Sequence, residues 1–388
     1  MSIAITKIST FEQFARLSQD WDALQARAQL DNIFLTHDWL NAWWRFFGQG
    51  ADLWVLTGRD NKQLVGIAPL MRQRSPGGGR VLSFMGTGDV VPNHLEFIVL
   101  PAERKNFIEA VCTFLWQTRS EWDILDLTAL PDDSPTRDLV TAGLQNSGIS
   151  THSQYDAPCP YTVLPDSFEA YLQTRGEDVR GQFRSKRRRL LRKHPEARFG
   201  RVETPDEVEG VFSALVRLHQ AHWQKLGHTG SFASQPLIEF YLSAAQNALQ
   251  SGRLRLYYLQ IDSDYAAVYY CFRIGYRMMY YSSGFDDRWR KFSIGIQLLA
   301  YALEQSIAEG AAEFDFLQGD EVYKLDWATH TRGNWRLQAA SPHLRGQMIW
   351  AMRRSIATGR TAGRAIMPPT VRQALKRYLG LLKRRGRT

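Results

Sequence analysis

Apolar and polar residues follow two different periods in the second half of the chain. Runs rich in aromatic and β-branched residues predict three consecutive strands, at 254–261, 265–274 and 278–283. Between residues 294 and 309 the apolar residues instead recur at spacings of three and four, which predicts a helix with one apolar face. A further aromatic run at 313–317 predicts another strand. The local order is therefore strand, loop, helix and strand.

The same order of elements occurs twice along the chain. The helices expected ahead of the strands lie at 11–28 and 34–48 in the first half, and at 205–226 and 235–251 in the second. The other elements expected in the first half are strands at 52–58, 63–73, 94–100 and 122–130 and a helix at 103–118. This repetition indicates an internal duplication. We expect an α/β (α+β) fold made of two tandem halves, each with a mixed, mostly antiparallel sheet flanked by helices.

Prolines predict where the two halves join. Pro158, Pro160 and Pro165 fall within eight residues, a density that is typical of a connection. We therefore expect a first half at 1–160 and a second half at 161–345, followed by a basic tail at 346–388.

Composition places the chain among globular proteins. Its 388 residues are 44% hydrophobic and 22% charged, which is enough apolar material for two or three packed domains. No run approaches the roughly 18 apolar residues that a membrane-spanning helix needs, and the first residues lack the pattern of a signal peptide. The three cysteines are far apart and have no metal-ligand spacing. We expect a cytoplasmic protein, with the inner membrane face as a peripheral location.

Charge is distributed unevenly along the sequence. No acidic residue follows Asp326, whereas 14 of the 48 Lys and Arg residues do. Residues 1–326 therefore carry 34 basic and 39 acidic side chains, a net charge of −5, and residues 327–388 carry +14. We expect the tail to meet an anionic surface, such as lipid head groups, an acidic polymer or an acidic partner. The alternative is a solvated tail without a partner.

The loop before helix 294–309 combines positive charge with small residues. Arg290, Ser293 and Gly295 fit the pattern Gln/Arg-x-x-Gly-x-Gly/Ala, with serine at the first glycine position, and Arg288 and Lys291 add charge. Small residues let the backbone approach a pyrophosphate, and the amino end of a helix attracts anions. Ser293 is also suited to cap the helix, and Gly310 to end it. We expect a phosphate-binding loop. The alternative is an ordinary basic turn.

The segment around this loop resembles a known superfamily. The sequence "YYSSGFDDRWRKFSIGIQLLAYALEQSIAEGAAEFDFLQGDEVYKLDWA" is similar to the acyl-CoA transferase part of GNAT acetyltransferases, and "FDFLQGDEVYKLDW" is similar to the branch labelled CelD or BcsL, after genes found near cellulose synthesis. "FSALVRLHQAHWQKLGHTGSF", "FLTHDWLNAWW" and "LVGIAPL" extend the resemblance over about residues 10–340. The chain departs from the pattern at Ser293. The resemblance implies two GNAT-like halves and acetyl-CoA or another acyl-CoA as co-substrate, without a metal.

Polar residues after strand 313–317 are candidates for proton transfer. An amine acceptor is almost wholly protonated at pH 7, so its attack on a thioester requires a proton acceptor, for which Asp320 and Glu321 are candidates. The resemblance implies that Tyr323 protonates the leaving thiolate. Asp315 and Lys324 are expected to contact the substrate. Alternatively, the carboxylates lie on a solvated edge and Tyr323 packs locally.

Other polar and aromatic clusters have two interpretations each. The resemblance places His219 and Trp223 beside the acceptor, although a buried structural role is equally compatible, and no third ligand completes a metal site with His219 and His222. The Arg- and Lys-rich stretch 180–200 is expected to form a cationic helix for acidic substrate, CoA phosphates or lipid, or a solvated helix, with nucleic acid less favoured. Five apolar residues at helical spacing form a core or, less often, a sugar-stacking surface: Trp39, Leu40, Trp43, Trp44 and Phe47.

These features together predict an acyltransferase. The acyl-CoA arm is expected along Tyr281, Ser282 and Ser283, with its pyrophosphate on the loop 290–295, and the acceptor is expected to attack the thioester directly. The amine or hydroxyl acceptor is unidentified, with a cell-envelope or polysaccharide-related molecule as one class. The alternatives are a Fem-type aminoacyl transferase, which shares the duplicated architecture and uses aminoacyl-tRNA, and a non-catalytic scaffold bound to membrane or polysaccharide.

Overall fold

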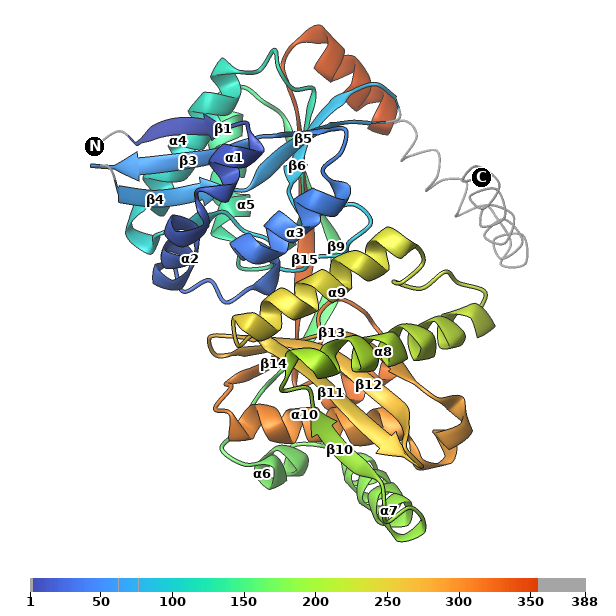
Figure 1. The fold of residues 1–388 in the computed structure, drawn as a ribbon. Helices are drawn as coiled ribbons and strands as arrows, with labels where there is room; N and C mark the ends of the chain where they lie inside the picture. The colour runs from blue at the N-terminus through green and yellow to red at the C-terminus, as the bar shows by residue number, and fades with distance from the viewer. Residues whose placement is uncertain (1–2, 62, 76, 355–388) are drawn as a thin grey trace, which may run out of the picture.

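The computed structural model describes residues 3–354 except 62 and 76, and shows two similar halves that share one long sheet (Figure 1). In each half a strand is followed by helices, a meander of strands, a helix, a strand, a helix and a last strand. The expected duplication of a mixed α/β unit is therefore confirmed.

The first half contains strands in two sheets. Its elements are β1 (Ala4–Ile8), α1 (Phe11–Ala15), α2 (Ser18–Arg27), η1 (Ile33–Leu35), α3 (His37–Phe47), β2 (Ala51–Leu53), β3 (Val55–Asp60), β4 (Gln63–Ala68), β5 (Leu70–Arg74), β6 (Arg80–Phe84), β7 (Ile98–Val99), η2 (Pro101–Glu103), α4 (Arg104–Gln117), β8 (Ile124–Pro131), α5 (Pro135–Asn146) and β9 (Thr151–Val163). Four of these strands form a separate sheet in the order β1-β3-β4-β7.

The second half follows the same plan after two additional helices. Its elements are α6 (Phe168–Gln173), α7 (Glu177–Lys193), β10 (Arg198–Arg201), α8 (Pro205–Lys225), α9 (Gln235–Gln250), β11 (Leu254–Ile261), β12 (Asp264–Ile274), β13 (Arg277–Phe285), η3 (Asp287–Phe292), α10 (Ile294–Ala308), β14 (Glu313–Asp315), α11 (Val322–Trp327) and β15 (His330–Ala340). A helix over residues 344–354 follows β15.

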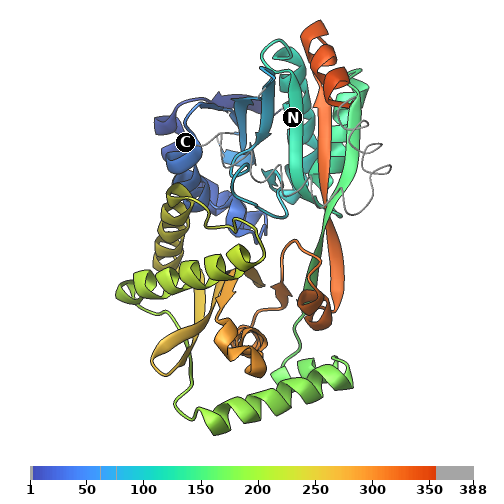
Figure 2. The same ribbon diagram turned by 90° about the vertical axis from the view of Figure 1, so that its right-hand side faces the viewer.

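One 11-stranded sheet crosses both halves, in the order β10-β11-β12-β13-β14-β9-β15-β8-β6-β5-β2. The long strands β9 and β15 pair with each other and run from one half into the other (Figure 2). The carboxyl end of β9 pairs with β14 of the second half, whereas the carboxyl end of β15 pairs with β8 of the first. Each half therefore contributes its last strand to the other.

Alternating side chains of the second half bury both faces of its sheet. Leu256, Tyr270 and Phe272 pack in the cluster that contains α8 and α9, and Tyr257 and Tyr269 pack on the opposite face with α10. This alternation is the period-two pattern that predicted the strands.

Helix α3 contacts the second half through Trp39 and neighbouring aromatic side chains. Trp39, Leu40 and Trp43 are buried, and Trp44 and Phe47 are partly buried against the same core, so the core interpretation is confirmed. The Trp39 ring lies 5.1 Å from that of Phe240 and 5.7 Å from that of Phe272, measured between centroids. An aromatic cluster therefore joins the two halves.

Several boundaries differ from the sequence expectation. The helix expected at 11–28 is divided into α1 and α2, and the strand expected at 94–100 is reduced to Ile98–Val99. The proline-rich junction near residue 160 lies inside β9, where Pro158 and Pro160 face Gly333 and Thr331 of β15. Residues 355–388, most of the expected basic tail, lie outside the described residues.

Candidate functional site

The strands β13 and β14 separate from each other and leave a fork in the sheet of the second half. They pair in parallel from Arg277 and Glu313 as far as Met279 and Asp315. β13 continues to Phe285, whereas the chain after β14 turns toward β9. A parallel pair that opens in this way exposes backbone edges on both arms, which suits an extended ligand.

Residues of the first half hold the departing arm of the fork. The amide N–H of Phe316 donates to the carbonyl of Pro160 at 3.0 Å, and that of Gly319 donates to the carbonyl of Pro158 at 2.9 Å. The amide of Gln318 donates to Oδ1 of Asn93 at 3.0 Å. The fork is therefore kept open by β9 and by a loop of the first half.

Three hydroxyl groups meet at the opening of the fork. The Tyr280 hydroxyl donates to Ser283 Oγ at 2.6 Å and lies 3.1 Å from the Tyr323 hydroxyl, which comes from α11 on the other arm. Burial raises the pKa of Tyr280 to about 12 and raises the pKa of Tyr323 well above its usual value. Both phenols are therefore protonated at neutral pH and can donate hydrogen bonds.

The expected carboxylates lie at the start of α11. Asp320 and Glu321 are exposed, and Glu321 Oε2 pairs with Lys324 Nζ at 3.1 Å. Lys324 is buried and also donates to the carbonyl of Gln318 at 2.8 Å. Lys324 therefore fixes the turn that carries Tyr323, and Glu321 lies two residues from it.

The loop that follows the long arm of the fork ends in a left-handed residue. Ser293 has φ 50° and ψ 49° directly before α10, a conformation that favours glycine and costs other residues about 1–2 kcal/mol. This explains why the sequence pattern has a glycine there. Ser293 occupies the cap position, but its side chain makes no capping hydrogen bond, so that detail of the expectation is wrong. Gly310 has φ 74° just past the helix end, as expected.

Cations from two elements surround the start of α10. Arg290 and Lys291 are exposed in η3, and Lys186 of α7 donates from Nζ to Ser293 Oγ at 2.9 Å. Arg288 instead pairs with Asp286 at 2.7 Å and lies 3.6 Å from Asp264. The stretch 180–200 thus contains the expected cationic helix, and its Lys186 adds charge beside the predicted phosphate loop.

His219 connects α8 to β13. Its Nδ1 lies 2.8 Å from the carbonyl of Ser283 and its Nε2 accepts from the amide of Ser231 at 3.1 Å, which places the proton on Nδ1. Burial lowers the pKa of His219, so the ring is neutral. Both nitrogens are occupied, so the ring has a structural role here.

The neighbouring predicted residues lie around His219. Trp223 is partly exposed with its ring 5.9 Å from His219, and Ser282 Oγ is 3.4 Å from His219 Nδ1. Tyr281 points into the aromatic cluster, where its hydroxyl is 2.7 Å from that of Tyr241. Of residues 281–283, therefore, only the backbone and the Ser283 side chain face the fork.

Asp315 lies in an ion-pair network between the halves. Its carboxylate is fully buried, 3.0 Å from His94 Nε2 and 2.7 Å from Arg332. Burial alone would raise the pKa of Asp315, but the charges of His94 and Arg332 outweigh it and hold the pKa well below its usual range. Asp315 therefore orders the base of the fork, and its carboxylate is already engaged.

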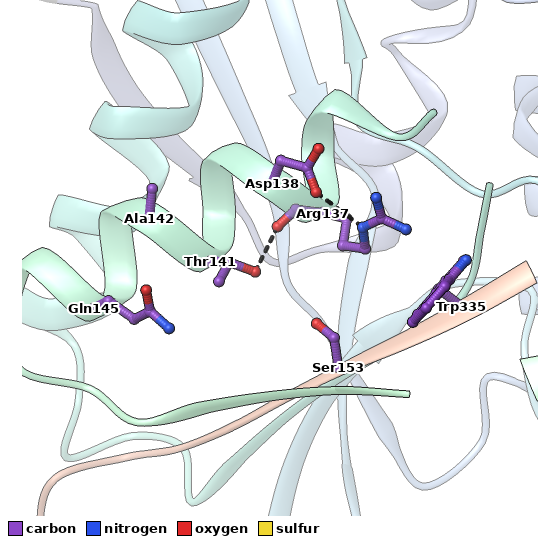
Figure 3. A pocket seen from close by; sticks show the side chains of 7 residues that line it. All are labelled: Arg137, Asp138, Thr141, Ala142, Gln145, Ser153 and Trp335. Carbon is purple, nitrogen blue, oxygen red and sulfur yellow. Dashed lines mark hydrogen bonds and ion pairs between the residues drawn. The ribbon is translucent and has the colours of Figure 1, made fainter. Parts of the chain in front are cut away.

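The corresponding region of the first half is built differently. Its loop 85–97 contains no Lys or Arg, and α4 packs directly on α5, where a Cβ added at Gly143 would lie 2.7 Å from Cys112 Sγ. A hollow of about 420 Å³ does lie beside α5, between that helix and β9 and β15 (Figure 3). It is lined by Arg137, Asp138, Thr141, Gln145, Ser153 and Trp335, none of which is a predicted site residue.

Sequence reasoning did not single out four residues in and near the fork. The sequence predicts Tyr280 only as part of a strand, and Lys186 only as part of a cationic helix for acidic substrate, CoA phosphates or lipid. Asn93 and His94 come from the first half, and the only local signal was a polar pair inside an apolar stretch. Their proximity depends on long-range packing.

Comparison with known proteins finds a family match within the second half. Residues 177–325 match the family model described as "Acetyltransferase (GNAT) domain". A search among curated proteins found no match. Among solved structures, the chain is similar to FemX, with a TM-score of 0.60, 12% identity and coverage of 86% of this chain and 96% of that one.

Two further structures share the fold over most of the chain. A conserved protein of unknown function from Bacteroides thetaiotaomicron has a TM-score of 0.54 and 12% identity, over 87% of this chain and 99% of that one. The C-terminal domain (DUF2156) of a protein named as a lysylphosphatidylglycerol synthetase from Agrobacterium fabrum has a TM-score of 0.53 and 10% identity, over 87% and 96%. These similarities concern the fold. Among residues 3–354, leaving aside 62 and 76, no helix has the length and apolar character to cross a membrane.

Proposed function

We propose that the protein is an acyl-CoA-dependent N- or O-acyltransferase whose donor site is the fork of the second half. The observation that carries this proposal is the arrangement along β13. Tyr280 and Ser283 meet Tyr323 at the opening of the fork, and the basic loop with Arg290 and Lys291 follows directly after the strand. The six residues from Tyr280 to Phe285 span about 17 Å, a length that suits an extended acyl-CoA arm.

The donor phosphates would bind where cations and helix dipole act together. The amino end of α10 presents unpaired amide N–H groups, and Arg290, Lys291 and Lys186 lie around it. Lys186 beside a positive helix end is unfavourable without an anion, so a bound pyrophosphate would relieve the repulsion. Ser293 and Gly295 would keep the backbone accessible.

Transfer would proceed by direct attack of the acceptor on the thioester carbonyl carbon. The C–S bond breaks, CoA leaves as a thiolate, and Tyr323 donates its proton to the sulfur. Glu321 or Asp320, both exposed near Tyr323, would accept the acceptor's proton directly or through water. No cysteine serves as nucleophile in this scheme, because Cys112, Cys159 and Cys271 are all buried.

The acceptor would approach between α8 and the fork, beside Trp223. We retain a cell-envelope or polysaccharide-related molecule as the acceptor class, on the strength of the sequence resemblance of "FDFLQGDEVYKLDW" to the CelD or BcsL branch. Incubation of the protein with acetyl-CoA and a cell-envelope extract, followed by mass spectrometry, identifies the acylated product.

An aminoacyl transferase that uses aminoacyl-tRNA is the second candidate. The fold similarity to FemX favours this candidate, and so does the cationic helix α7 beside the predicted phosphate loop. Acetyl-CoA separates the two candidates, because a ligand at 100 times its dissociation constant stabilises the folded protein by about 2.7 kcal/mol. A rise in melting temperature with acetyl-CoA supports the first candidate. No rise, together with a mobility shift of aminoacyl-tRNA, would support the second.

A further inference from the structure

The chain that follows β15 returns to the outer surface of the first half. Helix 344–354 packs one face on the turn 77–79 and on β6 (Figure 1). Trp350 is buried with Val81 and Ile124, and Ile349 packs against them. This face of the helix is therefore fixed to the folded protein.

A second side of the same helix is apolar and exposed, and its Met352 end borders the turn 77–79. Leu344, Met348 and Met352 follow at intervals of four residues, which aligns them along one side, and they are 78%, 64% and 48% exposed. Most large apolar residues of the described chain are buried, so three exposed ones in a row are unusual for a protein surface. The helix therefore has an exposed apolar side in addition to the apolar side that packs on the first half.

A cation lies beside this apolar face. Arg345 is exposed next to Leu344, and it is held at the rim because its Nη2 donates to the carbonyl of Gly78 at 2.7 Å and its Nε lies 3.6 Å from Asp123. The sequence beyond the helix, residues 355–388, contains nine Lys and Arg residues and no acidic residue. The apolar face therefore leads directly into the most cationic part of the sequence.

We propose that Leu344, Met348 and Met352 dock the protein on an anionic lipid bilayer. The three side chains enter the interface between head groups and acyl chains, and the net charge of +14 over residues 327–388 attracts the protein to anionic lipid. A bilayer matches both features, because it offers apolar surface and negative charge side by side. A second copy of this chain would bring another strongly cationic segment to the same place. The inference does not depend on acyl transfer.

An environment-sensitive fluorophore at residue 348 tests the proposal in the full chain. The three native cysteines are buried, so Met348→Cys can be labelled selectively with a nitrobenzoxadiazole probe. Vesicles of 70% phosphatidylcholine and 30% phosphatidylglycerol should shift the emission to the blue, and pure phosphatidylcholine vesicles should not. The matched control is Leu226→Cys, which labels an exposed leucine (56%) on the second half and should show no shift.

A substitution series gives an independent measurement. The triple variant Leu344→Ser, Met348→Ser and Met352→Ser should lower partitioning into the same anionic vesicles by about tenfold or more, at unchanged circular dichroism. The control variant Leu226→Ser with Tyr276→Ser should bind like the unsubstituted protein, because both residues lie elsewhere on the surface.

Three outcomes would overturn the proposal. The first is equal vesicle binding by the triple variant and its control. The second is an unshifted probe at residue 348 in anionic vesicles. The third is a concentration-dependent dimer in sedimentation velocity that the triple variant abolishes, because that result assigns the apolar face to a second copy of the chain.

Discussion

Burial determines the protonation of the tyrosines at the fork. The pKa of Tyr323 lies well above its usual value, mainly because a charged phenolate would be poorly solvated there. Tyr323 is therefore a proton donor at every pH near neutrality, and Tyr280 and Ser283 hold its hydroxyl in place through a short chain of contacts. In the proposed reaction this protonated phenol donates a hydrogen bond to the leaving sulfur, which stabilises the negative charge that develops there.

Replacing Tyr323 by phenylalanine tests that role. Tyr323→Phe should lower kcat by about 10²-fold or more and leave CoA affinity almost unchanged, since only the proton donor is removed. Steady-state kinetics and calorimetric CoA titration measure the two quantities. Tyr276→Phe, at an exposed tyrosine, is the matched control. Normal turnover in Tyr323→Phe would show that this residue only packs.

A buried carboxyl in the first half predicts a pH-dependent stability. Burial raises the pKa of Glu96 from 4.5 to about 7, although hydrogen bonds from Ser134 and Thr136 oppose this. The folded protein therefore binds this proton more tightly than the unfolded chain, and the stabilisation is complete below about pH 4.5 and is lost as the pH rises to about 7.

Glu96→Gln should remove this dependence. The variant should be more stable than the original protein at pH 8 by roughly 1–3 kcal/mol and should lose less stability between pH 5 and pH 7. Urea unfolding at several pH values measures both effects, with the exposed Glu109→Gln as control. An identical pH profile in Glu96→Gln and the original protein would mean that Glu96 is ionised in the fold.

At the level of elements, the predicted phosphate loop combines parts of η3, α7 and α10. Local patterns predicted β11 at its observed bounds and α10 to within one residue, because apolar periodicity reports burial directly. They missed the contact of Lys186 with Ser293, because a charged residue on a helix carries no information about which distant loop it faces.

Removing charge from the loop should weaken donor binding. Arg290→Ala with Lys291→Ala should reduce CoA affinity tenfold or more, because each charge-assisted contact to phosphate contributes about 1.5–3 kcal/mol. Isothermal titration calorimetry gives the affinity. Arg16→Ala with Lys105→Ala removes two exposed cations from the first half and should have no effect. Unchanged CoA binding in the loop variant would contradict the phosphate assignment.

The whole molecule depends on strand exchange between its halves. β9 and β15 each pair with strands of both halves, and Trp39 joins the aromatic cores. The sequence predicted the duplicated order of elements, since each half has the same local periodicities. It predicted the junction near residue 160 because closely spaced prolines usually mark a connection, whereas Pro158 and Pro160 lie inside β9, paired with β15.

The shared sheet predicts a single unfolding transition. Separating the halves would break the β9–β15 ladder and expose the cluster around Trp39, so neither half should unfold alone. Differential scanning calorimetry of the full chain should show one peak with matching calorimetric and van't Hoff enthalpies. Two resolved peaks would show that the halves are independent domains.

Hydrogen–deuterium exchange with and without acetyl-CoA shows which half of the molecule binds the acyl donor. We expect slower exchange with acetyl-CoA in peptides that cover 280–297 and 316–327, which contain both arms of the fork, the basic loop and the start of α10. Peptides of α4 and α5 should exchange at the same rate in both conditions. Protection confined to the first half, or no protection anywhere at saturating acetyl-CoA, would contradict a donor site at the fork.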